Sequence, residues 1–349
     1  MLSLFVLIFG VQLGAVIVLY YGQIQLKYNQ LSEVENTTIL IPFKNEEQRI
    51  LPLLQSINKS AIKYKKSGLF SHIQIIFIDD HSLDNTFQVI LDNLDVSFQV
   101  FKLNNTSGKK YAIKIGVEQA KFNRILTLDA DVKFDVDYLL NISKTECKNL
   151  TILPVEMYGN TIFNKLFTVE FWFLQFITFG LSGLKKNELC NGANLLFTKS
   201  TYLQTLPIRY DAHIASGDDM FLLEAVKNLK LNIQSVNSKL VSVFTPSPNT
   251  YSELLSQRLR WVSKSKNTLT ILSGLFILVS NVLLVLSIVF ILKGDFIFIL
   301  PILLKVVSEL ISVKSLSKYM IVLIHQLYYP FYLIVILFKM VFHKNISWR

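Results

Sequence analysis

The sequence predicts an α/β domain with a mostly parallel sheet, and transmembrane helices at both ends of the chain. Between residues 37 and 150, short apolar runs alternate with segments of helical periodicity, which is the pattern of parallel strands joined by crossover helices. Long uncharged stretches lie outside this region, near the N-terminus and in the last third of the 349 residues. The hydrophobic fraction of 51% exceeds that of an ordinary soluble protein, and the excess is concentrated in those stretches.

Four apolar stretches are candidates for contact with a bilayer. Leu2 to Tyr21 and Leu269 to Leu292 contain no charged residue and are long enough to cross a membrane, so we expect both to span it. Phe296 to Val313 and Tyr319 to Phe342 contain charged or polar residues. Each could be a span, part of a re-entrant hairpin broken at Pro330, or a helix lying in the interface, and these alternatives stay open.

The flanking charges predict the orientation. The first stretch has no basic region before it and no small-residue cleavage signature, so we expect an uncleaved anchor. Lys27 follows this anchor, and Lys264 and Lys266 precede the second span, which places the intervening domain in the cytoplasm. We therefore expect an integral protein of the inner or plasma membrane. The predicted organisation is an anchor at 1–22, a cytoplasmic domain at 23–268 and a membrane region at 269–349 with two or three hydrophobic segments.

The chain has an excess of basic residues and only two cysteines. Its net charge of +10 favours anionic partners. These could be lipid headgroups or a nucleotide, and both alternatives stay open. No basic cluster interleaved with aromatic residues marks a nucleic-acid surface, so we expect no nucleic-acid partner. Cys147 and Cys190 are far apart and lack the spacing of a metal or redox site, which fits a reducing cytoplasm.

The middle domain has a strand and helix pattern that places polar groups at one edge of a sheet. The expected strands cover residues 38–42, 73–78, 98–103 and 125–128, and the expected helices cover 46–62, 87–94 and 109–122. Ligands gather at the carboxyl ends of parallel strands. Three of these strands end in polar segments, which are Pro42-Phe-Lys-Asn-Glu46, Asp79-Asp80 and Asp129-Ala-Asp131. Separate strands therefore deliver polar groups to the same edge.

Residues 160–184 differ from the domain around them. The segment is rich in Phe and Leu, carries Glu170 near its middle and ends before Lys185-Lys186. A charge in this central position disfavours a membrane span. We expect an amphipathic interfacial helix, with a buried helix as the alternative.

Asp129 and Asp131 follow the apolar run that begins at Arg124. Side chains two residues apart share a face of a strand, so both carboxylates point the same way. Two oxygen ligands side by side suit a hard divalent cation that also holds a diphosphate. A second pair, Asp135-Val-Asp137, has the same spacing without the apolar approach, which shows that spacing alone identifies no metal site.

Two further motifs follow predicted strands and open helices. In Asp79-Asp80-His-Ser-Leu-Asp84, carboxylates could accept hydrogen bonds from a base or a ribose hydroxyl. The alternative is that Ser82 or Asp84 caps the next helix. Gly108-Lys109-Lys110 opens a helix where free N–H groups and basic side chains suit a phosphate, or it is a solvated loop.

Two motifs lie in the second half of the domain. Ser216-Gly-Asp218-Asp219 precedes an apolar helical pattern. Its carboxylates either complement a helix N-terminus or supply a general base that removes a proton from an acceptor hydroxyl. Gln257-Arg-Leu-Arg260-Trp261 lies just before the second span. It either forms a basic-aromatic belt at headgroup level, or it places Arg260 against a phosphate and Trp261 against a sugar.

Taken in chain order, these motifs resemble those of membrane-bound family 2 glycosyltransferases, which include ceramide glucosyltransferase-like enzymes and polysaccharide synthases. The resemblance covers about residues 37 to 262. Its landmarks are Pro42-x-x-Asn45-Glu46, Asp79-Asp80-x-Ser82-x-Asp84, Gly108-Lys109 with Ala112, Asp129-x-Asp131, Asp218-Asp219-x-x-Leu222 and Gln257-x-x-Arg260-Trp261. It implies a GT-A fold, a nucleotide-diphosphate sugar donor, Mg²⁺ or Mn²⁺ as cofactor, and inversion at the anomeric carbon.

The resemblance also implies a role for each matched residue. The nucleoside and donor pocket would be lined by Pro42, Asn45, Glu46, Asp79 or Asp80, Lys109 and Asp129. Asp131, with Asp129 beside it, would hold the metal, and Asp219, next to Asp218, would be the catalytic base. The groups closing over the diphosphate and acceptor would be Gln257, Arg260 and Trp261. The chain departs from the pattern at His81, where glycine is usual, at Asp218, where Glu is common, and at Lys199, where an arginine pair is frequent.

The expected reaction is a direct displacement at the anomeric carbon. Asp219 would deprotonate the acceptor hydroxyl, and a metal held by Asp131, assisted by Arg260, would offset the charge of the departing diphosphate. The predicted membrane segments are few for a polymer channel, so we expect a UDP-sugar donor and a lipid or lipid-linked acceptor at the cytoplasmic membrane face. The alternative is a processive polysaccharide synthase. A catalytically silent, sugar-nucleotide-binding membrane scaffold is the alternative of another class.

Overall fold

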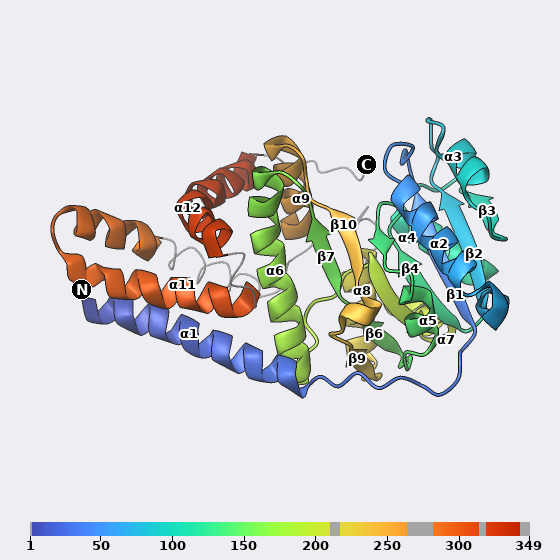
Figure 1. Cartoon of the computed structure of the whole chain (residues 1–349), viewed down its shortest axis with the longest axis horizontal. Coiled ribbons are helices and arrows are strands. Elements are labelled where there is room, and N and C mark those ends of the chain that lie inside the picture. Colours follow the sequence, from blue (N-terminus) through green and yellow to red (C-terminus); the bar gives the residue numbers. More distant parts are fainter. Residues whose placement is uncertain (1, 210–216, 264–281, 314–318, 343–349) are drawn as a thin grey trace. The chain divides into compact units, whose positions relative to one another are not determined.

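The structure, a computed structural model, describes residues 2–209, 217–263, 282–313 and 319–342 (Figure 1). The described residues form two compact units, each built from separate segments of the chain. The sheet unit comprises residues 25–157 and 181–246. The helical unit comprises residues 2–24, 158–180 and 247–342, within the described ranges.

A seven-stranded sheet is the centre of the sheet unit, with the strand order β3-β2-β1-β4-β8-β6-β9. Its strands in chain order are β1 (Thr37–Phe43), β2 (Ile73–Asp79), β3 (Gln99–Lys102), β4 (Arg124–Leu128), β6 (Leu150–Ile152), β8 (Asn194–Thr198) and β9 (Ile233–Ser235). All seven residues of β1 are buried, because this strand is paired on both sides and covered on both faces. This burial explains the continuous apolar run of its sequence.

The sheet is mixed. The neighbours from β3 to β4 are parallel, and so are β6 and β9, but β8 runs antiparallel to both β4 and β6. Six of the seven strands thus run in one direction, which confirms the prediction of a mostly parallel sheet, and β8 is the exception. The chain enters β8 after the long excursion through α6 (Ile162–Gly183), so no short crossover helix obliges β8 to run parallel to β4.

Helices of the sheet unit pack on this sheet (Figure 1). They are α2 (Leu51–Lys63), α3 (Thr86–Asn93), α4 (Lys109–Gln119), α5 (Tyr138–Ser143), α7 (Lys199–Thr205) and α8 (Asp218–Asn228). The approach of α4 is close at Gly116, where an added Cβ would lie 3.0 Å from Ile78 Cδ1 and 3.1 Å from Leu40 Cδ1. A small second sheet has the order β5-β10-β7, formed by β5 (Lys133–Phe134), β7 (Val155–Tyr158) and β10 (Val243–Pro246).

The observed elements agree with the predicted ones in the first half of the domain. One predicted boundary is wrong, because the helix expected from residue 46 begins at Leu51. The residues between form a turn whose side chains belong to the candidate site described below. Beyond residue 150, strands β6 to β10 were not predicted, because each has only three to five residues.

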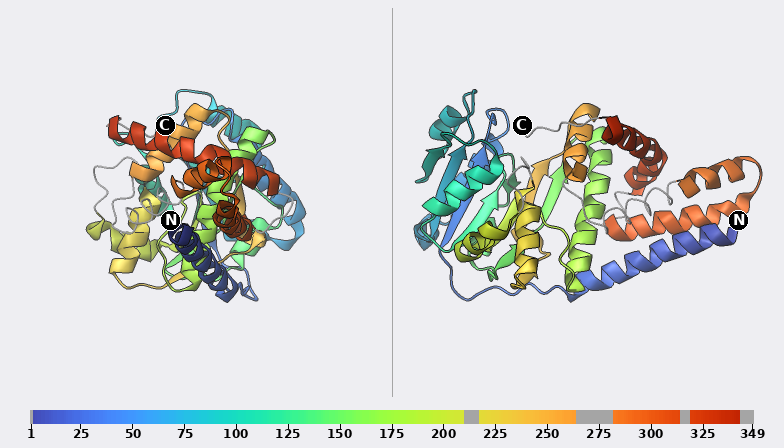
Figure 2. Two further views of the ribbon diagram at one scale, coloured as in Figure 1. Left: turned by 90° about the vertical axis from the view of Figure 1, so that its left-hand side faces the viewer. Right: turned by 180° about the vertical axis from the view of Figure 1, so that it is seen from behind.

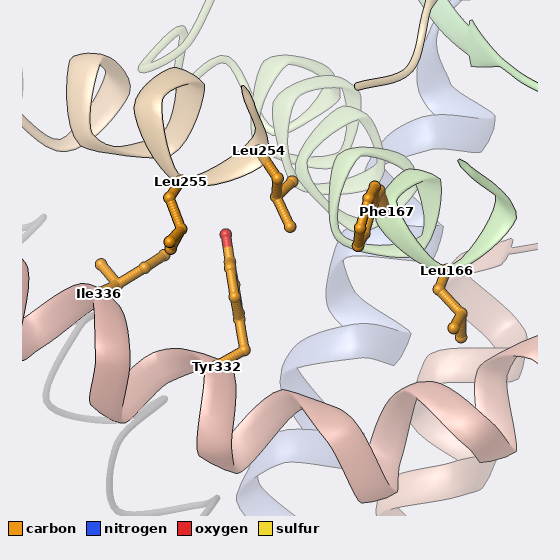
Figure 3. Packing of buried hydrophobic residues seen from close by; sticks show 6 residues of the cluster. All are labelled: Leu166, Phe167, Leu254, Leu255, Tyr332 and Ile336. Carbon is orange, nitrogen blue, oxygen red and sulfur yellow. The ribbon is translucent and has the colours of Figure 1, made fainter. Parts of the chain in front are cut away.

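The helical unit consists of α1 (Leu2–Gln25), α6, α9 (Tyr251–Ser263), α11 (Ile299–Val313), α12 (Tyr319–Phe342) and shorter helical segments. Figure 2 shows α1 and α11 side by side, and Phe5 and Phe9 of α1 pack in one buried cluster with Phe298, just before α11. A second cluster joins α6, α9 and α12 (Figure 3). Its buried members are Leu166, Phe167, Leu254, Leu255, Tyr332 and Ile336.

Two helices in the described part of the chain are long and apolar enough to cross a membrane, Ser3–Gln25 and Ile162–Gly183. Most of the expected span from Leu269 to Leu292 lies outside the described residues, and its remainder, Val282–Leu292, is a short apolar helix. Membrane spans at the C-terminal end therefore stay a prediction. The helix α12 continues through Pro330, so the expected alternative of a hairpin broken there is not observed.

Candidate active site

Three parallel strands of the sheet unit end in the polar segments singled out from the sequence. The register of β1 and β2 places Phe43 opposite Asp79, so Lys44 and Asp80 leave the sheet at the same level. Strand β4 pairs with the other side of β1 and leads to Asp129. The predicted convergence of these segments on one edge is thus present in the fold.

The loop after β1 is fixed to the loop after β2. Asn45 adopts a left-handed conformation with φ of 54°, which Asn tolerates better than most residues. Its backbone N–H donates to Ser82 Oγ at 3.1 Å, and its Oδ1 accepts from the backbone N–H of Leu83 at 2.8 Å. Pro42, by contrast, is buried within β1 opposite Ile78. Both residues therefore hold the backbone of the expected nucleoside pocket in place.

Asp79 and Asp80 are both buried, and their carboxylates hold loops in place. Asp79 Oδ1 accepts from the backbone N–H of Ser82 at 2.8 Å. Asp80 Oδ2 accepts from the backbone N–H of Gly108 at 3.0 Å and lies 3.6 Å from Lys44 Nζ, while its Oδ1 lies 3.1 Å from His81 Nδ1. Asp80 thus connects the ends of β1 and β2 to the start of α4. His81 has φ of 60°, a conformation that glycine adopts at lower cost.

Glu46 presents a buried carboxyl group to the site. Its Oε1 accepts a 2.7 Å hydrogen bond from Arg49 Nη2, and its Oε2 is buried without a hydrogen-bond partner among the described residues. The pKa of Glu46 is raised to about 8, chiefly by burial; the charge of Arg49 opposes this rise, and the charges of Asp131 and Asp129 contribute to it. Glu46 is therefore mostly protonated at neutral pH and can donate as well as accept.

Lys109, at the first position of α4, forms an ion pair with Asp129. Burial lowers the pKa of the Lys109 ammonium, but the Asp129 carboxylate outweighs it and raises this pKa above its usual value. Burial and the adjacent charge of Asp129 raise the pKa of Asp131. Lys109 and Arg49 oppose that effect, so both cations face this acidic pair.

Asp218 and Asp219 begin α8 but have different surroundings. Asp218 is buried and forms an ion pair with Arg209, which is also buried. Asp219 Oδ2 accepts from the backbone N–H of Gly192 at 2.9 Å, and its Oδ1 accepts from the N–H of Met220 at 2.9 Å. Both carboxylates raise the pKa of Lys109, which places α8 beside the Asp129 segment. The expected helix N-terminus and the expected acidic pair are thus both present.

The third expected group lies in the other unit. Gln257, Arg260 and Trp261 belong to α9 of the helical unit. Gln257 Oε1 accepts a 2.5 Å hydrogen bond from Arg258 Nη1. The expected roles of these three residues in closing over a diphosphate stay predictions.

The residues present fit a divalent cation only in part. Among the described residues, no three His, Cys, Asp or Glu side chains gather closely enough to hold a metal ion. Asp129 and Asp131 supply two carboxylates whose mutual repulsion a cation would relieve, and Glu46 interacts electrostatically with both. Mg²⁺ is commonly held by one or two carboxylates together with substrate phosphates, so this donor set suits a cation that arrives with a diphosphate.

Sequence reasoning missed Arg49, Arg209 and Gly192. Arg49 lies three residues after Glu46, a spacing at which side chains of a turn or helix meet, and this signal could have identified the pair. Arg209 and Gly192 come from distant loops, and nothing in the local sequence indicates their partners, Asp218 and Asp219.

An α/β unit with this strand order and acidic groups at the ends of its parallel strands belongs to the class of nucleotide-sugar-binding folds called GT-A. Residues 38–158 match the model of glycosyl transferase family 2. The chain therefore carries a family 2 glycosyltransferase domain of the GT-A type.

Relatives of known name support this assignment. Poly-beta-1,6-N-acetyl-D-glucosamine synthase of Staphylococcus aureus is 26% identical over 254 residues, which are 68% of this chain and 57% of the relative. The synthase of Staphylococcus epidermidis is 29% identical over 147 residues, 40% of this chain and 33% of the relative. The chain thus spans just over half the length of the first of these relatives.

One solved structure shares the fold at low sequence identity. The mannosyltransferase PcManGT from Pyrobaculum calidifontis, solved with GDP-Man and Mn²⁺, matches 99% of both chains with a TM-score of 0.52 and 12% identity. S. aureus TarS in complex with UDP-GlcNAc matches 66% of this chain and 68% of its own, with a TM-score of 0.42 and 14% identity.

Proposed function

We propose that this protein transfers a sugar from a nucleotide-diphosphate donor to the hydroxyl group of an acceptor, with inversion at the anomeric carbon. The observation that carries the proposal is the electrostatic coupling of acidic groups from separate segments. Glu46 interacts with Asp129 and Asp131, and Lys109 interacts with Asp129 and with the pair at the start of α8. A fold alone does not require such a costly concentration of charge.

The donor would bind along the ends of β1, β2 and β4. Asn45 and Asp79 keep the loops after β1 and β2 in place, and the protonated Glu46 can donate a hydrogen bond to the nucleoside or its phosphates. Lys109 supplies a positive charge at the start of α4, where free backbone N–H groups favour a phosphate. Asp129 holds this ammonium group in position until the donor arrives.

The cation would be held by Asp131 and Asp129. When bound, Mg²⁺ or Mn²⁺ would offset negative charge on the diphosphate leaving group. Before the donor binds, Lys109 and Arg49 would limit the repulsion between the two carboxylates.

Asp219 is the proposed general base. Two backbone N–H groups, those of Gly192 and Met220, fix the orientation of its carboxylate. Asp218 suits the role less, because its carboxylate is buried against Arg209. Asp219 would accept the proton of the acceptor hydroxyl as its oxygen attacks the anomeric carbon and the bond to the diphosphate breaks. We also propose that three residues of α9 contact the diphosphate and the acceptor. They are Gln257, Arg260 and Trp261.

For the acceptor, we propose a lipid or lipid-linked molecule at the cytoplasmic face of the membrane. The length and apolarity of α1, and Lys27 directly after it, support a membrane-bound enzyme with this orientation. A processive polysaccharide synthase is the second candidate, and the names of the staphylococcal relatives favour it. Incubating the enzyme with labelled donor and membranes distinguishes the two, because one gives a short glycolipid and the other gives a long polymer.

The proposal is tested by a donor screen on the full chain purified in detergent. UDP-N-acetylglucosamine is the first donor to try, because the relatives are named for a polymer of that sugar. We expect release of nucleoside diphosphate that depends on Mn²⁺ or Mg²⁺ and on the acceptor. Donor binding without any release would instead identify a silent sugar-nucleotide-binding scaffold. No binding of any nucleotide sugar would contradict both functions.

A further inference from the structure

A polar cavity of about 560 Å³ lies beside the edge strand β9 of the sheet unit, and its lining includes none of the candidate site residues. Lys148 on its wall precedes β6, and Asn232 precedes β9. These strands run in the same direction as β4, whose carboxyl end leads to Asp129. Lys148 and Asn232 therefore lie at the opposite ends of the strands from Asp129, and the cavity extends along β9 to Ser235.

The wall of this cavity is basic. Its lining residues include Lys27, Lys148 and Lys185 together with Gln25 and Asn187, and no Asp or Glu lines it. Lys148 pairs with Glu146 outside the cavity, whereas Lys27 and Lys185 form no ion pair with a described residue. Several cations and neutral donors around one space suit a group with several anionic oxygens, such as a phosphate.

The chain reaches the cavity directly from two long apolar helices, α1 and α6. Gln25 is the last residue of α1, and Lys185 follows the end of α6. Within the helical unit these helix ends are packed together, because Gln23 Nε2 donates to the carbonyl of Phe176 at 2.9 Å. An added Cβ on Gly180 would lie only 2.8 Å from the carbonyl oxygen of Leu19.

The turn after α6 holds Lys185 in a defined position. Lys185 has φ of 62°, and its N–H donates to the carbonyl of Ser182 at 2.9 Å. The hydroxyl of Ser182 in turn is hydrogen-bonded to Ser235 of β9. A lysine after a helix can simply complement the helix dipole, but that role requires neither a second lysine from α1 nor a shared cavity.

We propose that this cavity binds the phosphate of an anionic phospholipid headgroup through Lys27, Lys185 and Lys148. Lys27 directly follows α1, the expected anchor, and Lys185 follows α6, the expected interfacial helix, so both lie at the depth of the headgroups, where basic side chains meet anionic lipid. None of the lining residues is a proposed catalytic or donor-binding residue, so the bound lipid is an anchor for the catalytic domain and differs from the sugar acceptor.

The test uses the full chain in a neutral detergent, titrated with phosphatidylglycerol or phosphatidylcholine micelles and followed by thermal unfolding. Phosphatidylglycerol is expected to raise the unfolding temperature, and phosphatidylcholine is not. The variant Lys27→Gln/Lys185→Gln is expected to bind phosphatidylglycerol roughly 30-fold more weakly, given the usual contribution of two basic side chains. The matched control Lys65→Gln/Lys66→Gln, which removes two exposed lysines from another surface, is expected to keep wild-type affinity.

Three results would overturn the proposal. Equal weakening in the control would show a general charge effect, and equal stabilisation by inorganic phosphate would show a free anion as the ligand. Loss of binding in the charge-preserving variant Lys27→Arg/Lys185→Arg would show that positive charge is not what the cavity supplies. Nucleotide-sugar binding, measured on the same samples, reports the donor site independently and confirms that each variant is folded.

Discussion

Arg258 on α9 donates a 2.6 Å hydrogen bond from Nε to Oε2 of Glu170, in the middle of α6. Arg258 is 2% exposed and also donates to the carbonyl of Phe167 at 3.2 Å. The hydroxyl of Tyr332 on α12 lies 3.4 Å from the same Glu170 oxygen. Glu170 was the reason to expect an interfacial position for α6, but its charge is compensated inside the helical unit. The carboxylate of Glu170 alone is therefore no evidence for an interfacial position of α6.

Removing one partner of this ion pair is expected to destabilise the helical unit. Glu170→Ala leaves a buried, uncompensated guanidinium, which costs about 3–5 kcal/mol in comparable buried pairs. The double variant Glu170→Leu/Arg258→Met removes both charges and is expected to lose much less. Unfolding in detergent, followed by circular dichroism, measures both. Similar losses in the single and double variants would show that packing, and not the charge pair, determines stability here.

The first half of the sheet unit was predictable because its strands are buried on both faces. Strands such as β1 then appear as continuous apolar runs that end where the polar site begins. The second half was not predictable, because β6 and β9 have three residues each and β8 depends on partners from distant parts of the chain. No local pattern distinguishes such strands from loops.

The two Asp-x-Asp pairs show what spacing alone can and cannot predict. Asp137 accepts a 2.5 Å hydrogen bond from Lys63 and a second one from Tyr64, and Asp135 is exposed. That pair joins surface elements. Asp129 and Asp131 instead interact with each other beside Lys109. The apolar strand before the first pair was the informative feature, since it carries both carboxylates to the ligand-binding edge of the sheet.

Replacing Asp219 with Asn is expected to abolish sugar transfer while donor binding survives. The amide keeps the size of the side chain but cannot accept the proton of the acceptor hydroxyl, and such a loss typically lowers the rate about 10²–10⁴-fold. Product formation from labelled donor gives the rate, and calorimetry gives the donor affinity. Asp135→Asn serves as the control, because this exposed residue has the same chemistry. Normal turnover by Asp219→Asn would remove the base assignment.

Asp131→Ala is expected to lose the part of donor affinity that depends on the cation. Titrating nucleoside diphosphate with and without Mn²⁺ should show a large effect of the metal in the wild type and in Asp135→Ala, and little effect in Asp131→Ala. Without Mn²⁺, the variant is expected to bind at least as well as the wild type, because removal of one carboxylate reduces repulsion of the diphosphate. An unchanged response to Mn²⁺ in Asp131→Ala would place the cation elsewhere.

Glu46 makes the stability of the sheet unit depend on pH. Its pKa is raised from 4.5 to about 8, chiefly by burial, so the folded state binds a proton that the unfolded state has released between these values. The contribution of Glu46 to the free energy of unfolding is therefore greatest below about pH 4.5. This contribution is lost as the pH rises toward 8. Glu46→Gln removes this dependence, and its stability relative to the wild type is expected to increase from pH 5 to pH 9. Denaturant unfolding across that range measures it, with Glu118→Gln on the exposed face of α4 as the control. A constant difference between wild type and Glu46→Gln at all pH values would show that Glu46 is ionised in the folded protein at neutral pH.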